Sequence, residues 1–233
     1  MQVQPEKPVL DAQTNVLYGS AMTRRFINPN QGHRRLWVLG ASLGGPAAVK
    51  EFLDNLPRNL PETCFLLAQH IDANFINSLR EMLDGHAGLK AEVVSGPMSM
   101  QPGHIYIVPV HRRLRILSSG LLAFAEDNWS APYSPNIDQV FTDAAMAFGN
   151  EVGAIVFSGM DEDGAEGCVR LAEAGAPVWV QSPETCGAAS MPGAVMARVK
   201  TEFCGSPAEL ALKFDQVSGD DAVKPNQQPG ISS

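Results

Sequence analysis

The chain has 233 residues, of which 45% are hydrophobic and 18% charged, so it can bury the core of one domain or of two small ones. Its formal net charge of −8 argues against non-specific nucleic-acid binding and against attraction to an anionic membrane surface. No apolar run approaches the roughly 18 residues of a membrane-spanning helix, and the N-terminus lacks the apolar core of a signal peptide. We therefore expect no nucleic-acid partner and no membrane insertion.

The two ends of the chain differ in composition from its middle. Residues 1–35 show no sustained periodicity and hold five basic against two acidic side chains, which predicts a tail or linker. The last residues are polar and rich in Gly, Pro, Asn, Gln and Ser, which is typical of disorder. We therefore expect one folded domain over residues 36–215 and a disordered C-terminal tail over residues 216–233.

Between the ends, short apolar runs alternate with helical stretches. The runs that predict buried strands cover 36–41, 64–68, 154–158 and 178–181. One helical pattern begins at Pro46 and a second covers 74–84. A third is indicated by apolar residues at helical spacing, namely Ile137, Val140, Phe141, Ala144 and Phe148. This alternation predicts β-α units, and hence an α/β fold with a doubly wound, mainly parallel sheet flanked by helices.

The segment between the second and third apolar runs has a different pattern. Residues 104–108, 112–117 and 121–126 resemble short strands, separated by Pro109 and by a Ser-Ser-Gly turn at 118–120. Closely spaced strands with turn residues between them favour antiparallel pairing. We expect a short antiparallel hairpin that is inserted in the α/β sheet or flanks it.

The most informative turn is GASLGGP at residues 40–46, which joins a predicted strand to a helix. Its three glycines permit a tight turn with close backbone approach. In open α/β sheets ligands bind beyond the carboxyl ends of the strands, and free amides at a helix start can hold an anion or a developing oxyanion. Ser42 is therefore a candidate nucleophile. The alternatives are a turn that only packs the helix on the strand, or one that cradles a phosphate.

Two further predicted strands end in residues that suit hydrolysis. His70 follows the second run and is a candidate base, while an acidic turn, SGMDEDG at 158–164, follows the third. A serine, a histidine and an acid are the components of a hydrolytic triad. Spacing alone does not select the acid, and Asp138 is a further candidate. A structural histidine and a solvated or metal-binding acidic turn are the alternatives.

Metal and redox sites are not predicted. The four remaining histidines form no H-x-x-x-H pair, and the four cysteines form no C-x-x-C pair. We expect no metal and no cofactor, and reduced thiols in a cytoplasmic protein. The residues concerned are His33, His86, His104, His111, Cys64, Cys168, Cys186 and Cys204.

Several motifs together resemble the CheB-type chemotaxis protein-glutamate methylesterases. They are G-A-S-x-G-G at 40–45, Gln69-His70, P-G-x-x-Y-I-x-P at 102–109, P-x-x-D-x-x-F at 135–141, S-G-M-x-x-D-G at 158–164 and Met191-Pro192. The resemblance runs from about Leu36 to Lys200. It implies that residues 36–215 are a methylesterase domain in which Ser42 is the nucleophile, His70 the base and Asp163 the acid that orients the base.

The resemblance also implies an activity and partners. The expected reaction is hydrolysis of glutamate methyl esters on the cytoplasmic helices of chemoreceptors, with release of methanol and with no cofactor. Backbone amides near Leu43 and Gly44, or that of Met160, would hold the oxyanion. Deamidation of receptor glutamines is the second expected reaction, and other chemosensory array proteins are further candidate partners. A non-catalytic array scaffold and a phosphate- or nucleotide-binding domain remain alternatives; the latter needs a basic residue near the turn, where only Lys50 lies close.

The chain also departs from the family pattern. Family members commonly carry an N-terminal receiver domain, for which residues 1–35 are too few, so we expect no phosphorylation switch within this chain. The basic tail is a candidate docking arm or a mere linker. Asp161 and Glu162 add negative charge to the acidic turn. Arg112, Arg113 and Arg115 form a positive strand edge that either contacts an acidic receptor helix or is simply solvated.

Overall fold

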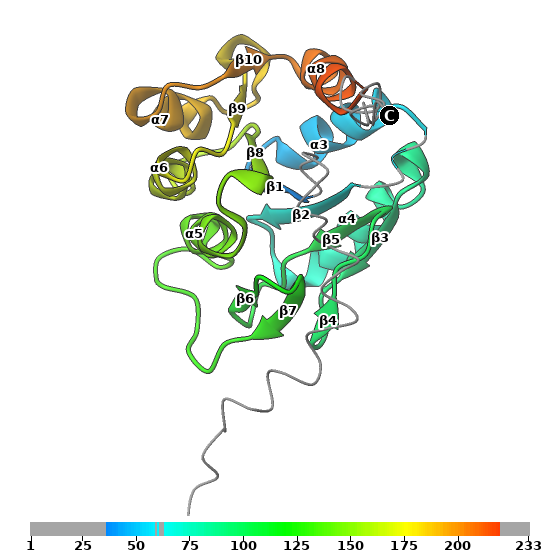
Figure 1. Cartoon of the computed structure of the whole chain (residues 1–233), viewed down its shortest axis with the longest axis vertical. Helices are drawn as coiled ribbons and strands as arrows, with labels where there is room; N and C mark the ends of the chain where they lie inside the picture. Colours follow the sequence, from blue (N-terminus) through cyan, green and yellow to red (C-terminus); the bar gives the residue numbers. More distant parts are fainter. Residues whose placement is uncertain (1–35, 59, 61–62, 220–233) are drawn as a thin grey trace, which may run out of the picture.

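The computed structural model describes residues 36–58, 60 and 63–219, which form a parallel sheet covered by helices on both faces (Figure 1). The expected N-terminal tail and most of the expected C-terminal tail lie outside the described residues. Helix α8 continues to Gly219, so the first residues of the segment expected to be disordered are helical. No helix in the described ranges is long and apolar enough to cross a lipid bilayer.

The main sheet has seven strands in the order β10-β9-β8-β1-β2-β5-β3, and every paired neighbour runs parallel. The chain enters at β1 in the middle, adds strands toward one edge, and then returns to build the other half. This is the doubly wound arrangement that the alternating pattern predicts. The strands are β1 (Leu36–Ala41), β2 (Cys64–Gln69), β3 (Lys90–Val93), β5 (His104–Ile107), β8 (Val152–Val156), β9 (Val178–Gln181) and β10 (Phe203–Gly205).

A second, three-stranded antiparallel sheet has the order β4-β7-β6. It contains the expected hairpin, formed by β6 (Leu114–Ile116) and β7 (Leu121–Phe124), and adds β4 (Met98–Ser99). The expectation that residues 104–108 belong to this antiparallel unit is wrong, because β5 lies parallel between β2 and β3. Ile105, Tyr106 and Ile107 are all buried, as a strand covered on both faces requires.

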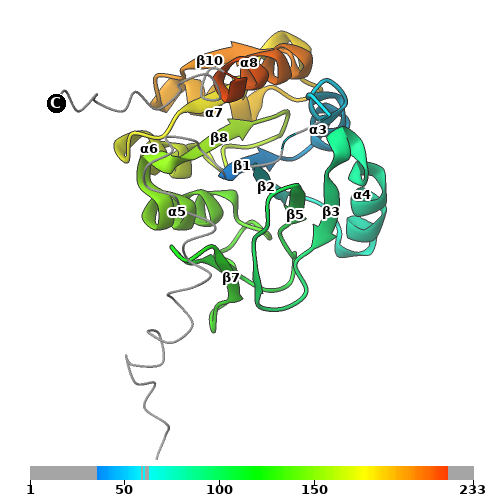
Figure 2. The same cartoon turned by 45° about the vertical axis from the view of Figure 1, so that its right-hand side comes forward.

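Two layers of helices cover the main sheet. One face packs against α3 (Gly45–Asp54), α4 (Ile76–Leu83) and α8 (Pro207–Gly219), and the other against α5 (Ile137–Phe148), α6 (Ala165–Glu173) and α7 (Ser190–Arg198) (Figure 2). Short 3₁₀ turns lie at Ala73–Phe75 (η1), His86–Gly88 (η2), Gly149–Glu151 (η3) and Pro183–Thr185 (η4). The small sheet extends the second layer beside α5.

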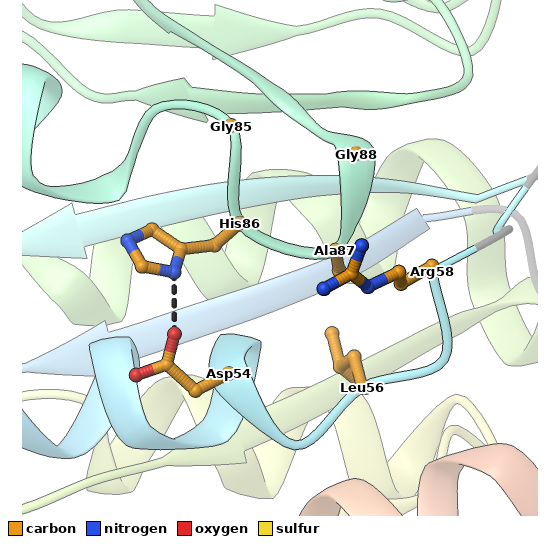
Figure 3. Close-up of a pocket in the computed structure, with 7 residues that line it drawn as sticks. All are labelled: Asp54, Leu56, Arg58, Gly85, His86, Ala87 and Gly88. Atoms are coloured by element: carbon orange, nitrogen blue, oxygen red, sulfur yellow. Dashed lines mark ion pairs between the residues drawn. The ribbon is translucent and has the colours of Figure 1, made fainter.

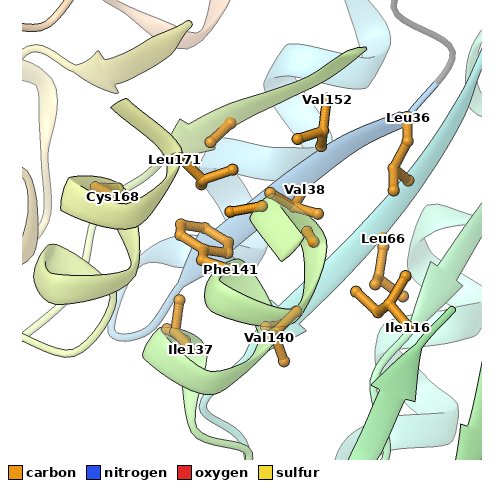
Figure 4. Packing of buried hydrophobic residues seen from close by; sticks show 14 of the residues in the cluster. Leu36, Val38, Leu66, Ile116, Ile137, Val140, Phe141, Val152, Cys168 and Leu171 are labelled. Atoms are coloured by element: carbon orange, nitrogen blue, oxygen red, sulfur yellow. The ribbon is translucent and has the colours of Figure 1, made fainter. Parts of the chain in front are cut away.

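Strand β1 shows how the two cores divide. Its side chains alternate between faces, so Leu36 and Val38 pack against the α5 side while Trp37 and Leu39 pack against the α3 side. Figure 4 shows the first of these cores, where Phe141 of α5 lies against the sheet. At the end of the strand Gly40 leaves room for α5, since a Cβ there would stand 2.9 Å from Phe141. The start of α5 is thereby drawn close to the carboxyl ends of the strands.

We predict that Gly153→Ala destabilises the fold, because a Cβ at this position in β8 would lie 2.7 Å from ring atoms of Trp37. Overpacking of this kind costs about 1–3 kcal/mol. The measurement is urea unfolding followed by circular dichroism.

The matched control is Gly193→Ala in α7, where a Cβ would meet nothing within 4 Å. That substitution should be neutral or stabilise by about 0.5–1 kcal/mol, because alanine is the better helix residue. Equal unfolding midpoints for the two variants would contradict the proposed packing.

Candidate active site

The carboxyl ends of three neighbouring strands bring the predicted site residues together. Ala41 of β1 is paired with Gln69 of β2, so Ser42 and His70 are the next residues on adjacent strands. The His70 amide donates to the Ala41 carbonyl at 3.0 Å, and the Ser42 amide donates to the Ser158 carbonyl, beyond β8, also at 3.0 Å. These bonds keep the three strand ends in register past the sheet itself.

His70 is hydrogen-bonded to Asp163, with 2.8 Å between Nε2 and Oδ2. The Asp163 side chain is fully buried and that of His70 is 18% exposed. An ionised carboxylate only accepts hydrogen bonds, so Nε2 carries the proton and Nδ1 keeps the free lone pair. The imidazole is thus held in the tautomer in which Nδ1 can accept a proton. The Ser42 hydroxyl makes no hydrogen bond with any described residue, His70 included.

Asp163 is in turn held by the N-terminus of α5. The Ile137 amide donates to Oδ2 at 2.8 Å and the Asp138 amide donates to Oδ1 at 3.0 Å. These are amides that the helix itself leaves without partners, and the positive end of the helix favours a negative group there. The buried carboxylate therefore has charge-stabilising donors from two elements.

The competing acids have other partners. Asp138 Oδ1 accepts from the Gly167 amide of α6 at 2.7 Å, and burial raises the pKa of this carboxyl, opposed by that same hydrogen bond. Glu162 Oε2 lies 2.5 Å from Arg198, and both are exposed. Asp161 is exposed and has a left-handed backbone, with φ of 64°. Among these carboxylates, Asp163 is the one that contacts His70.

Gln69 joins the serine turn to the histidine. Its Nε2 donates to the carbonyls of both Ser42 and His70, each at 2.9 Å, and the residue is only 2% exposed. Gly45 must be glycine here, because a Cβ would lie 2.7 Å from Gln69 Oε1. The Gln-His pair is visible in the sequence as a motif, but nothing in the sequence predicts that the glutamine side chain links the two backbone segments.

Ser158 also holds the serine turn in place, a role that the sequence does not predict. Its hydroxyl donates to the Leu43 carbonyl at 2.7 Å and accepts from the Ala188 amide at 3.0 Å. A Cβ on Gly44, whose φ is 78°, would stand 2.7 Å from the same hydroxyl. The serine turn is thereby pinned to the end of β8 and to the loop before α7. No spacing rule in the sequence points to such a contact across more than a hundred residues.

The predicted oxyanion donors lie around this turn. The backbone amides of Leu43, Gly44 and Met160 donate to no described residue. The side chains of Leu43 and Met160 are 57% and 50% exposed. The turn therefore offers unsatisfied amides to an anionic group. Lys50, the basic residue that a phosphate site would use, is ion-paired with Asp54 at 2.7 Å.

One further contact involves the histidine. The Tyr133 ring is stacked on the His70 ring, with 5.2 Å between centroids and 10° between planes. Tyr133 lies in the loop between β7 and α5, where the sequence shows no periodicity. No pattern in the sequence points to this residue.

The arginine-rich strand edge is engaged within the domain. Arg113 is paired with Asp127, and Arg115 Nε lies 3.0 Å from Asp143 Oδ2 on α5. Burial raises the pKa of the Asp143 carboxyl, and the two arginines oppose that rise. Arg112 lies over the Phe124 ring, 3.8 Å from its centroid. Of these contacts, the ion pair between Arg115 and Asp143 attaches the small sheet to α5.

A separate pocket of about 360 Å³ lies at the far end of α3 (Figure 3). Two of its lining residues form an ion pair, with 2.5 Å between His86 Nδ1 and Asp54 Oδ1. Helix α3 begins beside Ser42, so the pocket is about 15 Å from it, the length of a ten-residue helix. The pocket is lined by Asp54, Leu56, Arg58, Gly85, His86, Ala87 and Gly88, none of which is a predicted site residue. Nowhere in the described residues do three His, Cys, Asp or Glu side chains gather as a metal site.

Residues 37–214 match the family model described as CheB methylesterase. A protein-glutamate methylesterase/protein-glutamine glutaminase of Cupriavidus pinatubonensis is 34% identical over 182 residues, covering 77% of this chain and 51% of the relative. A protein-glutamate methylesterase/protein-glutamine glutaminase of Saccharophagus degradans is 32% identical over 166 residues, covering 71% of this chain and 45% of that relative. The chain thus spans about half the length of these curated relatives. The CheB methylesterase catalytic domain of Thermotoga maritima has the same fold, with a TM-score of 0.72 at 24% identity, covering 78% of this chain and 98% of that one.

We predict that Asp138→Ala destabilises the domain by about 1–3 kcal/mol, because it leaves the Gly167 amide without its acceptor. Asp138→Asn keeps an oxygen acceptor and should cost much less. Urea unfolding of both variants measures the difference. If alanine and asparagine are equally tolerated, the capping contact contributes no stability.

Proposed function

The chain belongs to the CheB methylesterase family, and on that premise we propose that it hydrolyses methyl esters of glutamate side chains on chemoreceptors. The observation that carries the proposal is the hydrogen bond between His70 and the buried Asp163, next to Ser42 at one sheet edge. The relatives named above are called protein-glutamate methylesterases, which supports this substrate class. The partners that we propose are the methylated cytoplasmic helices of receptors, which places the reaction in the cytoplasm.

In the acylation half, Ser42 Oγ attacks the ester carbonyl and its proton passes to Nδ1 of His70. Asp163 stabilises the imidazolium that results, since its carboxylate already accepts from Nε2. The tetrahedral oxyanion accepts hydrogen bonds from the free amides of Leu43 and Gly44, or from that of Met160. Collapse breaks the ester bond, and methoxide leaves with the proton from Nδ1 as methanol.

In the deacylation half, water attacks the acyl-serine and gives a proton to Nδ1 of His70. The second tetrahedral intermediate collapses, Ser42 Oγ takes that proton back, and the glutamate carboxylate is released. The net change is one ester and one water converted to one acid and one methanol.

Deamidation of receptor glutamines is the second reaction that we propose. The relatives above are also named protein-glutamine glutaminases. The same acyl-enzyme forms when the leaving group is ammonia, which takes its proton from the imidazolium. An amide is the poorer acyl donor, so this reaction should be the slower of the two.

Two measurements distinguish the enzyme from the other readings. A serine-directed phosphonate should add one phosphonyl group to Ser42, as read by mass spectrometry of the labelled peptide. Incubation with a methylated receptor should release methanol. A non-catalytic scaffold or a phosphate-binding domain would give neither result.

We expect Ser42→Ala to lower the rate of methanol release by about 10⁴- to 10⁶-fold, because no other group replaces the nucleophile. The unfolding midpoint should stay unchanged, since the Ser42 hydroxyl has no bond to a described residue. Wild-type turnover in this variant would refute the assignment.

The acid is tested by a pair of substitutions in one turn. Asp163→Asn should lower turnover by up to roughly 10⁴-fold, because the amide no longer fixes the tautomer of His70 or balances its charge. Asp161→Asn, an equal change of charge at an exposed position two residues away, should have far less effect. The reverse ranking would assign the role to Asp161.

A further inference from the structure

We propose that Tyr133 is a positioning residue for His70, whose stacked ring fixes the plane of the imidazole and stabilises its protonated form. The proposal rests on the function proposed above, in which the imidazole carries a proton between the serine, the leaving group and water. It assigns a role in that chemistry to a loop residue outside the triad.

The stacking geometry suits both effects. The two rings lie within the distance range of offset aromatic stacking, at 5.2 Å between centroids and nearly parallel. A cation within about 6 Å of an aromatic centroid is also attracted to the ring face. The tyrosine face therefore interacts with the neutral imidazole and attracts the imidazolium more strongly.

The hydrogen bond to Asp163 leaves the orientation of the imidazole incomplete. That bond fixes the position of Nε2 but permits the ring to turn about the line between Nε2 and Oδ2. A flat neighbour on one face removes this freedom. Nδ1, which must meet the serine proton, is then held in one direction.

The loop that carries Tyr133 is tied down on both sides. Trp129 Nε1 donates to the Pro109 carbonyl at 3.2 Å, and Ser134 Oγ donates to the Val110 carbonyl. Asn136 Oδ1 accepts from the Gln139 amide of α5 at 2.8 Å. The tyrosine is thus presented by an anchored loop, which a positioning role requires.

The charges around the stack favour a neutral phenol. Burial raises the pKa of Tyr133, and the nearby carboxylates of Asp161, Asp163, Glu162 and Asp138 raise it further. Glu162 is itself paired with Arg198. The phenolic hydroxyl therefore stays protonated at neutral pH, and the ring acts through its face rather than as a second base.

The test compares Tyr133→Phe, which keeps an aromatic face, with Tyr133→Leu and Tyr133→Gln, which remove it. In the leucine and glutamine variants kcat for methanol release should fall about tenfold with little change in KM. The acidic limb of the pH–rate profile should move to lower pH by roughly half a unit, because the imidazolium loses its stacked partner. The phenylalanine variant should behave as wild type.

A readout independent of activity is the NMR titration of the His70 ring in the same four proteins. Its midpoint should move to lower pH in the leucine and glutamine variants only. His104 is the internal reference, because it is stacked on Tyr106 with similar geometry, 5.4 Å and 9°, and keeps that partner throughout.

The outcomes separate this proposal from the function itself. A shifted His70 titration without methanol release would overturn the methylesterase function and keep the stacking effect. Methanol release with an unshifted titration and an unchanged pH profile would overturn the role of Tyr133. A phenylalanine variant as impaired as leucine would also overturn it, because the phenolic hydroxyl would then carry the effect.

Discussion

The buried carboxylate of Asp163 is the group on which the arrangement of the site depends. It accepts hydrogen bonds from the His70 ring and from the amides of Ile137 and Asp138. A buried carboxylate is costly unless donors surround it, and here the donors come from a strand end and a helix N-terminus. The start of α5 and the Nε2 atom of the imidazole are consequently positioned by the same side chain.

Two glycines allow the start of α5 to lie close to Asp163. Gly40 on β1 and Gly164 before α6 both face Ile137, whose Cγ2 would stand 2.9 Å from a Cβ at either position. Helix α5 can therefore approach the sheet edge until its first amides reach Asp163. These two glycines contribute to the site through this packing, and Gly164 also adopts a left-handed backbone with φ of 96°.

The sequence alone predicted much of this arrangement, for a physical reason. Ser42, His70 and the acidic turn each follow an apolar run, and the carboxyl ends of parallel strands meet at one edge, so their proximity could be inferred without coordinates. The place of β5 in the parallel sheet could not be predicted, because a short apolar run between turns is compatible with either sheet. Tyr133 and Ser158 contact residues that are distant in the sequence, and hydrophobic periodicity within a segment does not predict such contacts.

Asp163 and Asp138 each accept hydrogen bonds from backbone amides at the start of the other's helix. Asp163, just before α6, binds the first amides of α5, while Asp138, in the first turn of α5, binds an amide at the start of α6. Neither helix end can separate from the other without leaving both acids and their donors unpaired in a partly buried place. The two helix starts should therefore separate only together, and their separation would release the imidazole from its acceptor. The orientation of the catalytic acid is in this sense a property of the α5–α6 pair and not of the strand ends alone.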